Sequence, residues 1–165
     1  ALPLVRTFQS DFDDEELIYT VKLGYAFSSA VNTYASFTHG YKAGGINLDT
    51  TAAVGGADPR FLSEEVDAYE IGLKSQFADK SATLNLAGFY CDYHNQQFIS
   101  VDPATAAANL INIPESRIYG AEAELSWEAN SALTLQTGLG FLNSKVERGV
   151  ISGINIAGKK RPRSV

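Results

Sequence analysis

The stretch at residues 65–93 reads EVDAYEIGLKSQFADKSATLNLAGFYCDY, and its pattern decides the fold class. In its first half, Tyr69, Ile71 and Leu73 alternate with polar or small residues, which is the period of a strand with one apolar face. A polar tetrad follows at residues 78–81, and apolar residues then resume at every second position. Two such runs around a short polar connection predict a β-hairpin.

The same alternation recurs along the chain and predicts an all-β fold, an antiparallel up-and-down meander of about six long strands. The strands are expected at residues 17–27, 31–42, 66–77, 82–99, 116–128 and 132–144. Short turns are expected at residues 28–30, 78–81 and 129–131, and long loops at residues 43–63, 101–114 and 147–165. Because short and long connections alternate, all tight turns should lie at one end of the sheet and all long loops at the other.

Three aromatic pairs, each with its members eight positions apart on one face, suggest which solvent that face meets. The pairs are Tyr19 with Phe27, Tyr69 with Phe77, and Tyr119 with Trp127. Eight residues span ~26 Å of strand, or ~20 Å of membrane normal at a tilt near 40°. A transmembrane β-barrel carries an apolar band of ~25 Å between two aromatic girdles. The spacing therefore predicts that residues 1–165 are part of a large transmembrane barrel.

Composition excludes several other classes of protein. A net charge of −6 argues against nucleic acid as a partner. The single cysteine, Cys91, excludes an intrachain disulfide. The mean hydropathy of −0.08 is compatible with a barrel, in which only alternate residues face lipid.

A soluble sandwich or propeller is the competing interpretation. The aromatic pairs recur every fifty residues, a period that propeller blades also show. However, a blade carries four short strands, whereas each repeat here holds two long ones, and a sandwich would not sort its loops by length. We therefore favour the membrane barrel.

Five segments resemble motifs of the TonB-dependent outer-membrane receptors, and they occur in the family's order. They are YASFTHGYKAGGIN at residues 34–47, EEVDAYEIGLKS at 64–75, LNLAGFYCDY at 84–93, IYGAEAEL at 118–125 and LTLQTGLGFL at 133–142. The resemblance implies a segment of a ~22-stranded barrel whose lumen holds a plug domain.

The resemblance also implies a function and a location. Such receptors lie in the outer membrane of Gram-negative bacteria and import scarce nutrients, most often ferric siderophores, with energy passed through TonB. The plug domain, the TonB box and the aromatic C-terminal strand have no counterpart in the 165 residues. We therefore expect a fragment of the later half of the barrel, surrounded by outer-membrane lipid and linked to TonB only through the missing plug.

The chain carries no motif for catalysis, for a metal or for a cofactor, and we expect no enzyme activity. Asp92 and His94 are only two candidate ligands, too few for a metal site. If the chain contacts a ligand, the long loops do so, because binding residues concentrate on loops held by a rigid scaffold. The predicted contacts to an anionic ferric chelate are Lys42, Arg60 and His94, with simple solvation as the alternative for each.

Two other function classes remain open at the level of sequence. A passive porin or adhesin barrel would share the strand pattern, and an upstream plug and TonB box would decide against it. A soluble carbohydrate-binding β-domain is the third possibility, and membrane partitioning would separate it from both barrels. The motifs do not identify the ligand, because siderophore, cobalamin and glycan receptors share them.

Overall fold

The computed structural model of the chain describes residues 12–47, 59–101, 108–151 and 153–160, and all its regular elements are strands. The long strands are β1 (Tyr19–Ala26), β2 (Val31–Lys42), β5 (Glu64–Phe77), β6 (Ala82–Val101), β7 (Ala108–Asn130) and β8 (Leu133–Arg148). Four two-residue strands lie in the connections: β3 (Gly45–Ile46), β4 (Arg60–Phe61), β9 (Val150–Ile151) and β10 (Ile154–Asn155). Within the described residues, no helix is long and apolar enough to cross a bilayer.

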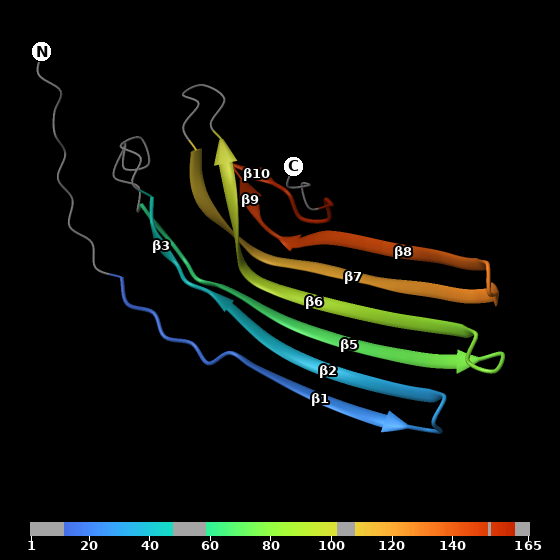
Figure 1. Cartoon of the computed structure of the whole chain (residues 1–165). Coiled ribbons are helices and arrows are strands. Elements are labelled where there is room, and N and C mark those ends of the chain that lie inside the picture. Colours follow the sequence, from blue (N-terminus) through green and yellow to red (C-terminus); the bar gives the residue numbers. More distant parts are fainter. Residues whose placement is uncertain (1–11, 48–58, 102–107, 152, 161–165) are drawn as a thin grey trace, which may run out of the picture.

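The long strands form one antiparallel sheet in the order β1-β2-β5-β6-β7-β8, so each pairs with the long strand before it. The sheet is curved, with its tight turns gathered at one end and its longer connections at the other (Figure 1). The predicted all-β meander is therefore confirmed. β3 pairs with β4, and β9 with β10, as two small hairpins at the end that carries the long connections.

The register carries the apolar face predicted from the sequence across all six strands. One row of the ladder contains Val21, Phe37, Tyr69, Tyr90, Tyr119 and Asn143. The rings of Phe37 and Tyr69 lie 4.9 Å apart, and those of Tyr69 and Tyr90 lie 6.4 Å apart. We call Phe37, Tyr69, Tyr90 and Tyr119 the outer aromatic row, and the face that carries it the outward face.

The second aromatic level lies close to the tight turns. Phe77, Ala82, Trp127 and Leu135 share a row there, so two of the predicted aromatic pairs join the same two rows. The third pair is displaced toward the loops, because Tyr19 is opposite His39, two residues beyond Phe37. The eight-residue spacing thus holds on each strand, whereas the register displaces the β1 pair by two residues relative to the other two pairs.

The apolar residues between these rows are exposed and have no second layer against them. Leu23 is 73% exposed, Ile71 63% and Leu139 75%, and among the described residues only Ala82, Ile113 and Val146 are buried hydrophobics. A soluble sandwich would bury such a face in a closed core. An exposed apolar face of this size requires a partner or an apolar solvent, and acyl chains supply the latter.

The inward face carries the polar partners of the alternation. Glu70, Lys74, Lys22, Glu122 and Glu124 all fall on it, as the sequence pattern predicts. Lys22 places its ammonium 4.1 Å from the centre of the Tyr34 ring, and that ring lies over Gly72 on the next strand. Charged groups on this face would be costly in hydrocarbon, so the face must meet water or protein.

Strand boundaries differ from the predictions at the loop end of the sheet. The long loop predicted at residues 101–114 is wrong in part, because β6 continues to Val101 and β7 already begins at Ala108. β5 likewise begins at Glu64, within the loop predicted at 43–63, and β8 continues to Arg148. Pairing between distant segments forms these extensions, and the local Ala-, Asn- and Pro-rich composition conceals it. Residues 48–58, 102–107, 152 and 161–165 of the predicted loops lie outside the described residues.

Within the described part of the chain, the sheet does not close on itself. β1 and β8 stand at the two ends of the strand order, and each pairs with a long strand on one side only. On β8, the Val146 N–H donates to the Lys159 carbonyl (2.8 Å) and the Gly158 N–H donates to the Val146 carbonyl (2.7 Å), at the loop end only. Unpaired backbone groups in hydrocarbon cost several kcal/mol each. In a membrane, the sheet therefore requires further strands on both sides.

The orientation of the faces can be tested with one arginine. Leu73 lies outward, midway between the two aromatic rows, so Leu73→Arg in a complete barrel that contains this segment should destabilise the barrel by about 2–4 kcal/mol. Gln76→Arg and Ala87→Arg, which point inward, should each cost much less. Urea titrations in lipid vesicles would measure all three, and equal penalties on the two faces would contradict the assigned orientation.

Two inward glycines on adjacent strands provide a test of packing. A Cβ at Gly120 would lie 2.4 Å from the Phe141 carbonyl oxygen, whereas a Cβ at Gly138 would meet nothing within 4 Å. Gly120→Ala should therefore destabilise the barrel by about 1–3 kcal/mol, because the ladder backbone must shift. Gly138→Ala should be close to neutral in the same urea titration. Similar unfolding midpoints for both variants would show that the close approach at Gly120 is absent.

Candidate functional site

The end of the sheet that carries the long connections is the candidate functional site. β2 ends at Lys42 and β5 begins at Glu64, but β6 and β7 continue past them and turn away from the sheet (Figure 1). The turn coincides with Asn95, whose φ is +50°, opposite Pro114, which has no N–H to donate. The β6–β7 ladder resumes beyond this point with Gln96 opposite Ile113. We call the part of β6 and β7 beyond this point the outer hairpin.

Two asparagines fasten the β2–β5 connection, which contains β3 and β4, to the outer hairpin. Asn47 Nδ2 donates to the Leu110 carbonyl (2.9 Å), and the Leu110 N–H donates to Asn47 Oδ1 (2.8 Å). Asn112 makes the same double contact with Leu62, at 2.9 Å and 2.7 Å. Each amide side chain thus takes the place of a peptide group in a strand pair. We call these two contacts the amide clamps.

A glutamine completes the fastening. Gln97 Nε2 donates to the Ala43 carbonyl (2.7 Å), and the Gln97 backbone N–H donates to the Glu64 carboxylate (2.7 Å). Below it, Gln96 is buried and its Oε1 accepts a hydrogen bond from the Ser116 hydroxyl (2.7 Å). Side-chain amides therefore join the described parts of the β2–β5 connection to β6 and β7, and we call this arrangement the amide-fastened rim.

The structure does not bring the three predicted ligand contacts together at one place. Lys42 is exposed at the end of β2, opposite Glu64 and on the inward face. Arg60 is exposed on β4, opposite Ile46. His94 shares the outward face with Tyr90 and lies between Glu65 and Glu115. Lys42 and Arg60 thus lie at the rim, whereas His94 points away from the interior.

Sequence reasoning missed a band of charged residues on the outward face, just beyond the outer aromatic row. Its first row is His39, Asp67, Asp92, Arg117 and Lys145, and its second is Glu65, His94, Glu115 and Arg148, with Glu147 at the bulge between them. We call these residues the charged belt. Each of His39, Asp67, Asp92 and Arg117 stands two positions from an aromatic residue of the row, which is a signal that the sequence does carry.

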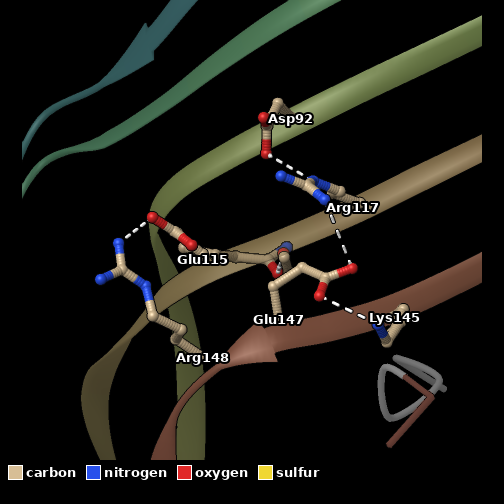
Figure 2. A network of polar contacts seen from close by, with 8 residues as sticks. Asp92, Glu115, Arg117, Lys145, Glu147 and Arg148 are labelled. Atoms are coloured by element: carbon tan, nitrogen blue, oxygen red, sulfur yellow. Dashed lines mark hydrogen bonds and ion pairs between the residues drawn. The ribbon is translucent and has the colours of Figure 1, made fainter. Parts of the chain in front are cut away.

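Contacts within the charged belt run across the strands. His39 Nδ1 lies 2.7 Å from the Asp67 carboxylate, and the Tyr19 ring stacks on His39 at 5.6 Å. Figure 2 shows a second group, in which Arg117 lies between two carboxylates, with Nε 3.6 Å from Asp92 and Nη1 3.6 Å from Glu147.

The remaining cations of the belt lie beside Arg117. Lys145 Nζ donates to Glu147 (2.9 Å), and Arg148 pairs with Glu115 (Figure 2). In the described part of the chain, no three His, Cys, Asp or Glu side chains are grouped so that they could hold a metal ion. This end of the sheet therefore carries two features: the amide-fastened rim beyond the inward face, and the charged belt on the outward face.

Comparison with known proteins identifies the family. The family model for the TonB-dependent receptor-like β-barrel matches residues 4–164. The chain is 29% identical over 119 residues to the pesticin receptor of Yersinia enterocolitica, covering 72% of this chain and 17% of that receptor. It is 26% identical over 134 residues to the probable TonB-dependent siderophore receptor PiuA of Acinetobacter baumannii, covering 78% of this chain and 17% of PiuA. The chain therefore spans about a sixth of the length of these relatives.

Solved structures show the same fold. The ferric yersiniabactin uptake receptor FyuA of Yersinia pestis superposes with a TM-score of 0.68 at 21% identity, over 89% of this chain and 21% of FyuA. The ferric preacinetobactin receptor BauA of A. baumannii gives a TM-score of 0.58 at 18% identity, over 82% of this chain and 19% of BauA. Since the family model spans nearly the whole chain, the protein belongs to the TonB-dependent receptor family, and this chain is part of its β-barrel in the Gram-negative outer membrane.

Proposed function

We propose that this barrel segment belongs to a receptor that imports a ferric siderophore through energised transport across the outer membrane. The names of the relatives support this proposal, because PiuA is described as a probable siderophore receptor and FyuA as a ferric yersiniabactin receptor. Nothing observed favours the alternative of a passive porin or adhesin. Contact with TonB would be made by a plug domain, as the family resemblance implies.

The amide-fastened rim is the observation that carries this proposal at the level of the chain. A ligand site built on loops needs those loops to be held in one geometry before the ligand arrives, since ordering them on binding would reduce affinity. Asn47, Asn112 and Gln97 hold the described parts of the β2–β5 connection against β6 and β7 through side-chain amides. The rim is therefore suited to receiving a ligand from outside.

Lys42 and Arg60 are the proposed ligand contacts at this rim. Both are exposed, and Lys42 lies on the inward face, so a cationic group there can meet an anionic chelate entering the lumen. His94 is the third proposed contact, and it lies on the outward face of the same end of the sheet.

Ligand capture can be tested in the complete receptor. Lys42→Gln together with Arg60→Gln should weaken binding of an anionic ferric siderophore about tenfold, because two favourable charges are lost. Lys74→Gln, deep on the inward face, is the matched control and should have little effect. Equilibrium binding of catecholate and hydroxamate ferric chelates would measure this, and unchanged affinity for all of them would remove these two residues from the site.

The transport step has its own test. Cells that carry the complete receptor should accumulate radioactive iron from the chelate that binds, and a protonophore should abolish this accumulation. Uptake that continues without an energised inner membrane would contradict active transport and favour a passive barrel.

The amide clamps predict a link between loop order and affinity. Asn112→Ala leaves the Leu62 N–H without its partner, whereas the Leu62 carbonyl keeps Gln97 Nε2 at 3.2 Å, and the lost contact should cost about 0.5–1.5 kcal/mol locally. Hydrogen exchange at the Leu62 amide should speed up accordingly, and ligand affinity should fall several-fold. Asn130→Ala removes a side-chain contact to the Ala132 N–H at the opposite end of the sheet and should leave affinity unchanged. Normal exchange at Leu62 in Asn112→Ala would show that the clamp does not hold the rim.

A further inference from the structure

The charged belt lies on the face that meets lipid, and its height above the apolar band is defined by the register. Its first row is two residues beyond the outer aromatic row. Two residues span ~6.6 Å of strand, or ~5 Å of height at a tilt near 40°. The headgroup layer of a bilayer is ~5–7 Å thick on each side of the hydrocarbon. The belt is therefore at the level of lipid headgroups.

The cations of the belt are concentrated on two strands. Arg117 lies on β7, and Lys145 and Arg148 lie on β8, with side chains 42%, 49% and 70% exposed. The belt residues of β2, β5 and β6 are instead acidic or histidine: His39, Asp67, Glu65, Asp92 and His94. The β7–β8 part thus presents three outward-facing cations in the plane of the headgroups, beside the carboxylates of Glu115 and Glu147.

The ion pairs of this part hold the cations in place without using all their donors. Both carboxylates near Arg117 lie at 3.6 Å, beyond normal hydrogen-bond length, and its Nε has no hydrogen-bond partner. A guanidinium has five N–H donors and a geometry that matches phosphate oxygens. Partly exposed ion pairs contribute little to stability, so folding alone does not explain why three cations lie together here.

We propose that Arg117, Lys145 and Arg148 form a binding surface for the phosphate groups of anionic lipid headgroups. Asp92, Glu147 and Glu115 form ion pairs with the three cations, and the exposed sides of the cations contact the lipid phosphates. Long cationic side chains can keep their stems near the acyl boundary while their charged ends reach the headgroups. This role is separate from ligand import, because the binding surface faces the membrane and not the lumen.

The surface can be tested in the complete receptor without any siderophore. The receptor would be purified in a neutral detergent, and bound phosphatidylglycerol and phosphatidylcholine would be counted by native mass spectrometry. Arg117→Gln with Lys145→Gln should reduce phosphatidylglycerol binding by ~5-fold for each charge removed. Lys22→Gln with Lys74→Gln removes the same charge from the inward face and should leave binding unchanged.

A third variant should not weaken phosphatidylglycerol binding, unlike the outward double variant. Glu147→Gln keeps Lys145 and Arg117 but removes the carboxylate between them, so it should retain or strengthen phosphatidylglycerol binding. Added salt should weaken binding to the wild-type receptor, whereas inorganic phosphate at the same ionic strength should displace no more lipid than that salt does. Equal lipid counts for the wild-type receptor and the outward double variant would overturn the proposal. Equal losses in the inward and outward double variants would also overturn it, as would weaker binding in Glu147→Gln. If the outward double variant fails to fold, the salt dependence of lipid binding to the wild-type receptor still tests the proposal, and binding that does not weaken with salt would overturn it.

Discussion

Backbone hydrogen bonding is the constraint on which the rest of the structure depends. In hydrocarbon, every N–H and C=O must find a partner within the protein, and the antiparallel ladder supplies those partners strand by strand. The same ladder fixes the register, and the register determines which side chains meet lipid and which meet the interior. A slip of one residue on β5 would move Tyr69, Ile71 and Leu73 inward and Glu70 and Lys74 into the acyl chains. Backbone pairing and the alternation of side chains therefore require the same arrangement.

The register also arranges the outward face by height. Apolar side chains occupy the middle, Phe37, Tyr69, Tyr90 and Tyr119 form a row beyond them, and the charged belt comes next. Each level matches the polarity of the bilayer at its depth, from acyl chains to headgroups. The amide-fastened rim, built from Asn47, Asn112 and Gln97, lies beyond the ends of β2 and β5, where a ligand would arrive. One set of strands thus supports a lipid surface and a candidate ligand rim.

Much of the fold can be predicted from sequence because alternation is a local signal, as the run from Tyr69 to Phe77 shows. The rim cannot be predicted in this way. Asn47 and Leu110 are 63 residues apart, and nothing in the composition around either residue indicates that they pair. His94 lies between these two cases. Its outward face follows from the sequence, because it is four residues after the outward Tyr90 on the same strand, but the prediction of a ligand contact rested on its charge alone. Local pattern thus predicts the strands and their faces, and long-range pairing determines the site.

The central claim is that the odd-numbered side chains of β5 from Tyr69 to Phe77 touch acyl chains while the even-numbered ones face a wet interior. Spin labels placed singly from Tyr69 to Phe77, in a complete receptor whose Cys91 is replaced by serine, would test it most directly. Collision rates with oxygen, which concentrates in lipid, and with a water-soluble nickel chelate should both oscillate with a period of two residues and in opposite phase. Rates that vary smoothly along the strand, or that oscillate in the same phase, would contradict the account.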